Sequence, residues 1–253
     1  MPHESELAAL YTTEYFEGAE QDEPELEDPN AFRWVGDSLP GPQHGLFIDL
    51  GCGDGRLLRL IADLGYEVLG LEINETAVMA AESASGCPVA IIDELPSFAN
   101  QAGAVHLGDV LEHASSPEVV VRRALTLLRP GGLFLVQGPL EANRSVFNFV
   151  LALVAVIRKS VPVSRPPYHV HLVSPRGQEQ FFHRLGLETL EYQLSNVSWP
   201  APAQFDSSLL KDPRRLALYA AQRISSVVRP LAPRLLSNRF KYIGRPFTQQ
   251  EHS

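Results

Sequence analysis

Three glycines at alternate positions constrain the fold of this chain more than any other feature of its sequence. Gly51, Gly53 and Gly55 directly follow a short apolar run, Leu46–Leu50, and directly precede a segment, 56–64, in which apolar residues recur at helical spacing. Because glycine has no side chain, a ligand can approach the main chain of such a turn closely. The helix that follows offers free N–H groups and the positive end of its dipole, so the turn suits an anionic group.

Short apolar runs and helical segments alternate along the chain from residue 46. The runs predict seven strands, at 46–50, 66–71, 88–92, 104–108, 133–137, 187–194 and 238–244. Helical periodicity predicts helices over 56–64, 75–84, 119–128 and 175–185, and the Pro130-Gly131-Gly132 stretch is expected to end the third of them. This order predicts an α/β fold, in which a doubly wound, mostly parallel sheet of seven strands has helices on both faces.

Charge is distributed unevenly along the 253 residues, whose net charge is −9. Residues 1–30 hold ten acidic residues and no Lys or Arg, whereas 197–253 hold nine basic and three acidic residues. We expect an acidic N-terminal arm at 1–30 and one domain at 31–253, with helical cap insertions at about 139–180 and 200–237. The acidic balance makes nucleic acid an improbable main partner.

The chain shows no sign of export in its sequence. Cys52 and Cys87 have no paired spacing, and the first residues lack a basic flank followed by an apolar core. These features predict a reducing, cytoplasmic setting. The longest apolar run, 146–157, is too short to span a bilayer. The segments 146–159 and 206–236 combine apolar and basic residues, so they are expected either to contact a membrane surface peripherally or to cap a substrate cleft.

The spacing of the glycines distinguishes two kinds of cofactor site. A dinucleotide-binding turn, G-x-G-x-x-G, would place its third glycine where Arg56 stands, whereas this chain reads D-x-G-x-G-x-G from Asp49 to Gly55. Glu72 ends the second expected strand, where a carboxylate can accept hydrogen bonds from the ribose hydroxyls of either cofactor. Asp93 follows the third expected strand at the same edge of the sheet.

The stretch from Asp49 to Gly55 resembles motif I of the class I S-adenosylmethionine-dependent methyltransferases. The blocks at 108–113 and 127–132 extend the resemblance, most closely to ubiquinone-pathway O-methyltransferases and to polysaccharide and natural-product methyltransferases. The resemblance implies S-adenosyl-L-methionine as cofactor and an oxygen of a small-molecule, sugar or lipid-linked acceptor. It implies cofactor contacts at Asp49, Gly51, Cys52, Gly53, Gly55, Glu72, Ile73, Asp93, Glu94 and Asp109.

Two other functions remain open alternatives at this point, a dinucleotide-dependent oxidoreductase and a noncatalytic cofactor-binding protein of the same fold. The chain also departs from the family where the fourth strand opens, since Gly103-Ala104 stands in place of the usual Phe-Asp. This departure leaves the acceptor and its reacting atom undetermined.

Three histidines are candidates for a general base, because a hydroxyl nucleophile benefits from losing its proton as it attacks. His113 follows the fourth expected strand, and His169 and His171 lie beyond the fifth, in the region that binds substrate in this family. Asp109, Glu112 and His113, with His169 as a fourth ligand, would also suit a divalent metal. The same block is common in relatives that need no metal, so we expect no metal site.

Overall fold

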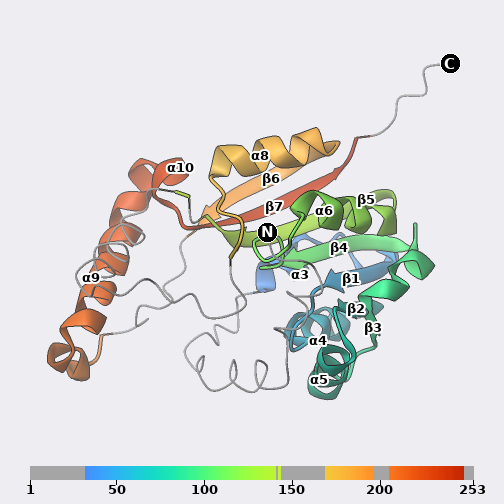
Figure 1. Cartoon of the computed structure of the whole chain (residues 1–253), viewed down its shortest axis with the longest axis horizontal. Helices are drawn as coiled ribbons and strands as arrows, with labels where there is room; N and C mark the ends of the chain where they lie inside the picture. The colour runs from blue at the N-terminus through green and yellow to red at the C-terminus, as the bar shows by residue number, and fades with distance from the viewer. Residues whose placement is uncertain (1–31, 141, 144–168, 196–204, 248–253) are drawn as a thin grey trace.

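The protein forms a single seven-stranded sheet in the order β3-β2-β1-β4-β5-β7-β6, in a computed structural model that describes residues 32–140, 142–143, 169–195 and 205–247 (Figure 1). The strands are β1 (Leu46–Leu50), β2 (Val68–Glu72), β3 (Val89–Ile91), β4 (Ala102–Gly108), β5 (Leu128–Pro139), β6 (Leu187–Ser195) and β7 (Arg239–Pro246). Strands β1 to β5 pair in parallel, and β7 runs antiparallel to both β5 and β6. The prediction of a mostly parallel sheet of seven strands is confirmed.

Helices cover both faces of this sheet. The described α-helices are α3 (Arg33–Ser38), α4 (Arg56–Asp63), α5 (Glu75–Ser85), α6 (Pro117–Leu127), α8 (Pro175–Arg184), α9 (Pro213–Val228) and α10 (Pro233–Leu236). The described 3-10 helices are η1 (Pro42–His44), η2 (Ile92–Phe98), η3 (Ser207–Lys211) and η4 (Arg229–Leu231). One apolar cluster joins α3, α4 and α5 to one face of the strands, and a second joins α6 and α8 to the other. Neighbouring residues of β1 divide between them, because Phe47 belongs to the first cluster and Ile48 to the second.

The boundary between α6 and β5 differs from the prediction. The helix ends at Leu127 and β5 begins at the next residue, so Pro130-Gly131-Gly132 lies inside the strand rather than ending the helix. The pairing with β4 shifts here, from Ala102 opposite Leu128 to Ala104 opposite Leu133. Gly131 has a φ of +78°, which permits this irregularity in the strand.

Close packing accounts for the unusual start of β4. A Cβ atom on Gly103 would collide with the main-chain carbonyl of His44 in η1. Position 103 therefore has no room for a side chain.

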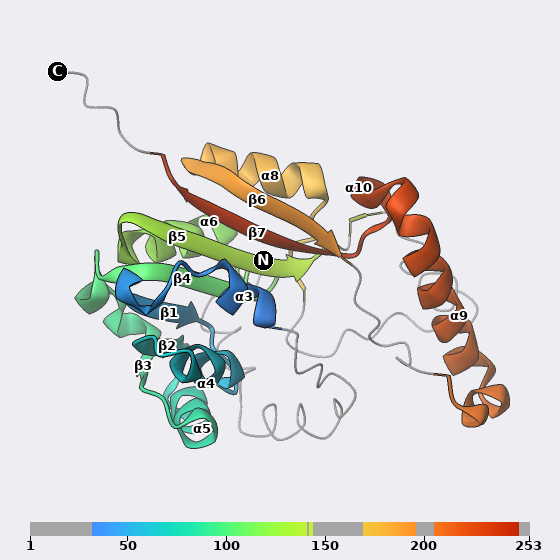
Figure 2. The same cartoon turned by 180° about the vertical axis from the view of Figure 1, so that it is seen from behind.

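The expected cap insertions lie partly within the described residues. The first insertion, 139–180, overlaps α8, which begins at Pro175, where the Ser174 hydroxyl accepts the N–H of Gly177. The second, 200–237, contains α9 and α10, which stand beside the edge of the sheet in Figures 1 and 2. The arm at 1–30 and the apolar run at 146–157 lie outside the described residues. None of the described helices is long and apolar enough to cross a membrane.

Candidate active site

The glycine turn connects β1 to α4 through three residues in the left-handed backbone region, with φ of +77° at Gly51, +57° at Gly53 and +72° at Gly55. A Cβ atom on Gly51 would lie 2.7 Å from Cγ2 of Val110, in the loop after β4. A Cβ atom on Gly55 would lie 2.6 Å from Cβ of Ser85 on α5. Glycine is therefore needed twice, once to keep the turn clear of the β4 loop and once to let the two helices pack. The open main chain fits the methionine end of the predicted cofactor.

Glu72, at the end of β2, holds its carboxylate against this turn. One carboxylate oxygen accepts the N–H of Gly53 at 2.7 Å, and the other accepts the N–H of Ile73 at 3.0 Å. Burial raises the pKa of Glu72, although both N–H groups act in the opposite direction. The structure thus brings Gly53, Glu72 and Ile73 together. The contact of Glu72 with a ribose stays a prediction.

Asp49 and Cys52 lie beneath the turn rather than at its surface. The Asp49 carboxylate is 2.7 Å from Nδ1 of His106, and both side chains are almost wholly buried. The Cys52 side chain belongs to the core beside Gly70, and burial raises the pKa of its thiol. The contacts predicted for Cys52 would therefore come from its main chain.

Asp93 and Glu94 occupy the first turn of η2, directly after β3. Ile91 of β3 pairs with Glu72 of β2, so the two acidic residues follow the strand adjacent to Glu72. Both side chains are exposed. Their contact with the adenine end of the cofactor stays a prediction.

Asp109 follows β4 with a φ of +55°, an uncommon conformation for a residue other than glycine. Its carboxylate is 2.5 Å from a guanidinium nitrogen of Arg239, the first residue of β7, and 3.4 Å from the Gln137 amide. Gln137 in turn accepts the indole N–H of Trp34 at 2.8 Å. Desolvation opposes the ionisation of Asp109. The charge and hydrogen bond of Arg239, together with hydrogen bonds from Glu112 and Gln137, outweigh it, so the pKa of Asp109 lies below its usual range.

Glu112 and His113, in the loop that follows β4, form a polar cluster with His169, which lies in the segment before α8. One ligand atom from each side chain lies within 4.8 Å of the other two, and the two imidazole rings are 4.6 Å apart between centroids. Burial, reinforced by the negative charge of Asp109, raises the pKa of Glu112 well above its usual value. The two imidazoles could accept a proton from a hydroxyl, or they could hold a divalent cation together with the ionised form of the Glu112 carboxyl group.

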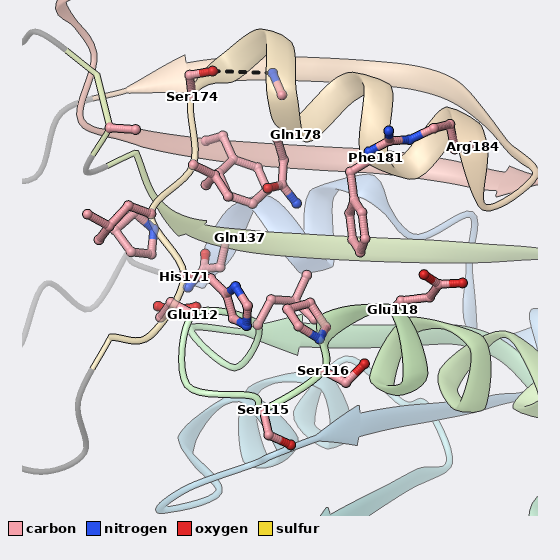
Figure 3. Close-up of a pocket in the computed structure, with 18 residues that line it drawn as sticks. Glu112, Ser115, Ser116, Glu118, Gln137, His171, Ser174, Gln178, Phe181 and Arg184 are labelled. Carbon is pink, nitrogen blue, oxygen red and sulfur yellow. Dashed lines mark hydrogen bonds between the residues drawn. The ribbon is translucent and has the colours of Figure 1, made fainter. Parts of the chain in front are cut away.

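His171 does not join the side chains of this cluster. Its main-chain N–H and that of Val170 donate to the carbonyl of Glu112, at 3.2 and 2.7 Å, which fixes the segment 169–171 against the β4 loop. The His171 side chain lines a cavity between α6 and α8 (Figure 3). Of the three predicted bases, the structure therefore pairs His113 with His169 and separates His171 from them.

A seven-stranded sheet whose last pair is antiparallel, with a glycine turn after β1 and an acid at the end of β2, defines a class I methyltransferase. A model of a methyltransferase domain family matches residues 28–192, well over half of the chain, and the chain belongs to this family. The protein is an enzyme that uses S-adenosyl-L-methionine as cofactor, and the alternatives of an oxidoreductase and a noncatalytic protein are set aside.

Curated relatives include two proteins named ubiquinone biosynthesis O-methyltransferase. The protein from Cupriavidus pinatubonensis is 29% identical over 178 residues, which cover 66% of this chain and 70% of that protein. The protein from a Methylobacterium species is 33% identical over 123 residues, which cover 46% of this chain and 48% of that protein.

Solved structures of similar fold share less sequence with the chain. An S-adenosylmethionine-dependent methyltransferase from Archaeoglobus fulgidus has a TM-score of 0.57 and 18% identity, covering 91% of this chain and 98% of that one. The magnesium protoporphyrin IX methyltransferase of Synechocystis has a TM-score of 0.54 and 15% identity, covering 85% and 80%. These similarities support the class I fold.

Four side chains of the site region were not predicted from the sequence, namely Trp34, His106, Gln137 and Arg239. Arg239 lies 130 residues from Asp109 along the chain, and Trp34 lies 103 residues from Gln137. No local motif marks such pairs. The one available signal was His106, a titratable residue within an otherwise apolar strand.

Proposed function

We propose that this enzyme transfers a methyl group to a hydroxyl oxygen of a small-molecule, sugar or lipid-linked acceptor. The observation that carries the proposal is the cluster of Glu112, His113 and His169. Glu112 and His113 of this cluster lie in the loop that touches the glycine turn through Val110. Such a cluster suits a nucleophile that must lose a proton as it attacks, as an alcohol must. An amine in its free-base form can attack without first losing a proton. The names of the relatives from Cupriavidus and Methylobacterium are consistent with an oxygen acceptor.

The cofactor, when bound, supplies a methyl group that is attached to a sulfonium sulfur. The sulfur is the leaving group, and it becomes a neutral thioether when the acceptor oxygen takes the methyl group. The residues of this chain then have two tasks. The Gly51–Gly55 turn and Glu72 position the cofactor, so that little freedom remains to be lost at reaction. The pair of His113 and His169 takes the hydroxyl proton as the new carbon–oxygen bond forms.

Single substitutions of the two histidines test this assignment. We expect His113→Asn or His169→Asn to lower kcat by about 100-fold or more, because general-base catalysis contributes about that factor, with the affinity for S-adenosylhomocysteine unchanged. His183→Asn, in an exposed residue at the end of α8, serves as control. Full activity in both site variants would contradict the assignment.

Product chemistry tests the acceptor atom directly. The enzyme is incubated with cofactor labelled in its methyl group and with hydroxyl-, amino- and carbon-nucleophile acceptors, and the new bond is identified by NMR. Label found on nitrogen or carbon alone would overturn the oxygen proposal.

We expect activity to persist in excess EDTA. Its loss, restored by Mg²⁺ or Mn²⁺, would instead make Glu112, His113 and His169 metal ligands.

A stripe of exposed apolar residues on α9 and η4 favours an acceptor held at a membrane. Ile224, Val227 and Leu231 recur at helical spacing with 52%, 76% and 85% of their surface exposed. The segment 206–236 carries six basic and two acidic residues. We propose that this apolar stripe and its surplus positive charge rest on an anionic lipid surface.

Vesicle sedimentation tests the lipid contact. The protein should pellet with vesicles of phosphatidylglycerol and phosphatidylcholine and less with phosphatidylcholine alone. The double variant Val227→Ser, Leu231→Ser should lose binding, whereas Met79→Ser, a change of an exposed apolar residue on α5, should keep it. Equal binding by all three proteins would contradict the proposal.

A further inference from the structure

A cavity of about 490 Å³ lies between α6, α8 and the end of β5. Its walls are mostly apolar, and Phe181 points into it from α8 (Figure 3). Other apolar side chains around it include Leu111, Pro117, Val173 and Phe240. This volume and character are those of pockets that bind small organic molecules.

One end of the cavity holds two buried polar atoms without hydrogen-bond partners among the described residues. They are Oε1 of Glu112 and Nε2 of His171. Glu112 is only 6% exposed, and in Figure 3 both side chains lie at the same end of the cavity. Because a buried polar atom is costly to leave unbonded, these two atoms indicate a ligand with a hydrogen-bonding group at this end.

This polar end adjoins the proposed reaction centre. A carboxylate oxygen of Glu112 lies within 4.8 Å of a ring nitrogen of His113 and of His169. A hydroxyl bound by Glu112 is therefore close to the two histidines proposed to take its proton.

The opposite end of the cavity carries a positive charge. Arg184, the last residue of α8, lines it beyond Phe181, with Glu118 of α6 nearby (Figure 3). Glu118 forms an ion pair with Arg122 at 2.9 Å, so its charge is balanced within α6. An anionic group on the ligand would find the Arg184 guanidinium as its partner.

We infer that this cavity binds the methyl acceptor, and that the acceptor is a largely apolar molecule with a hydroxyl at one end and an acidic group at the other. Glu112 and His171 orient the hydroxyl, Phe181 contacts the apolar body, and Arg184 selects for the acid. The inference rests on the proposed function, because it takes the hydroxyl to be the group that is methylated.

Two fluorescent probes that differ by one carboxylate test the inference, 6-hydroxy-2-naphthoate and 2-naphthol. Their binding to the protein saturated with S-adenosylhomocysteine is measured by fluorescence titration. We expect the naphthoate to bind about tenfold more tightly than the naphthol, the factor typical of one charge-assisted hydrogen bond. Arg184→Gln should abolish this preference and leave naphthol affinity unchanged. Arg176→Gln, in an exposed arginine of the same helix outside the cavity lining, should behave as wild type.

A second variant obstructs the cavity itself. Gly177 lines it, and a Cβ atom there would meet only the Ser174 hydroxyl, at 3.3 Å, so Gly177→Leu narrows the space with little disturbance of the helix. This variant should weaken both probes about tenfold. The inference is overturned if neither probe binds, or if Arg184→Gln and Gly177→Leu leave both affinities unchanged.

Methyl transfer to the probes separates this inference from the proposed function. Methylation of the naphthoate hydroxyl, lowered by Arg184→Gln and Gly177→Leu, supports both. Methylation that neither variant affects overturns the cavity as acceptor site and leaves the proposed function standing. Probe binding that both variants weaken, together with methyl transfer only to nitrogen or carbon in the acceptor panel, overturns the proposed function and keeps the cavity as a binding site.

Discussion

Gly51 occupies a position where a side chain would meet the loop after β4. Replacing it with valine would place a Cβ atom 2.7 Å from Val110 and force a β-branched residue to a φ of +77°. We expect Gly51→Val to weaken S-adenosylhomocysteine binding by more than about tenfold in calorimetry, because the β4 loop must move away.

Gly131 provides the control for backbone strain alone. It also has a positive φ, +78°, but a Cβ atom there would have no neighbour within 4 Å. Gly131→Ala should lower stability slightly and leave cofactor affinity unchanged. Unchanged affinity in Gly51→Val would show that the turn is not the cofactor site.

The raised pKa of Glu112 predicts that the stability of the folded protein depends on pH. The pKa of this residue is raised in the folded protein, so folding favours its protonated form, and the stability it contributes is lost as pH rises above the unfolded value of about 4.3. Glu112→Gln stays neutral and keeps its hydrogen-bonding shape. The Tm of Glu112→Gln should therefore rise relative to that of wild type as the pH increases above about 4.3, as measured in thermal melts at a series of pH values.

The exposed carboxyl group of Glu67 offers a matched comparison. Glu67→Gln should follow the wild-type profile over the same pH range. A constant difference in Tm between Glu112→Gln and wild type at every pH would mean that the folded protein does not hold Glu112 in its protonated form.

Sequence reasoning located main-chain features of the site better than its side-chain pairs. The turn at Gly51–Gly55 and the carboxylate of Glu72 could be predicted from neighbouring residues, because each lies where a short apolar strand ends and a helix follows. The Asp49–His106 and Asp109–Arg239 pairs depend on how distant strands meet in the sheet, which no local pattern encodes. The grouping of His113 with His169 likewise needed the folded path of the chain.

At the scale of single elements, α8 packs against the sheet through the fully buried ring of Phe182. Phe182 packs against Phe134 of β5 and lies 4.2 Å from Tyr242 of β7 between ring centroids. Phe182→Ala should lower the free energy of unfolding by about 3–5 kcal/mol, as measured in urea, because it leaves a cavity in the core.

Phe247, which follows β7 and is 46% exposed, is the control for loss of a phenyl ring. Phe247→Ala should cost less than about 1 kcal/mol, as expected for a partly exposed residue. Equal losses in the two variants would contradict the role given to Phe182 in holding α8.

Element boundaries were predicted less well than element types. Proline and two glycines after α6 indicated a break, yet β5 passes through them because β4 offers hydrogen-bond partners on both sides of the irregularity. Tertiary pairing thus outweighed local propensity at this point. The strand β1 was predicted with its observed bounds, since it is short, apolar and limited by Gly45 and Gly51.

At the scale of the whole molecule, the side chains described at the site lie between Trp34 and Arg239. Residues 1–30 lie outside the described residues, and their acidic composition predicts a solvated arm separate from the cofactor site. Removal of residues 1–30 should therefore leave S-adenosylhomocysteine affinity within about twofold of the full chain, since charges on a solvated arm are largely screened at physiological salt. Calorimetry of the two proteins side by side measures this, and a loss of tenfold or more would assign the acidic arm to the cofactor site.

The strand order has a consequence for how the protein is made. β6 is paired only with β7 in the sheet, and β7 also brings Arg239 to Asp109. During synthesis, β6 leaves the ribosome before the strand that will lie between it and β5. A nascent chain that ends before residue 239 contains β1 to β5 and the glycine turn, but it lacks the strand that pairs with β6 and the Arg239 that pairs with Asp109. The methyltransferase site is therefore completed last, by the strand that inserts into the sheet between two strands already made.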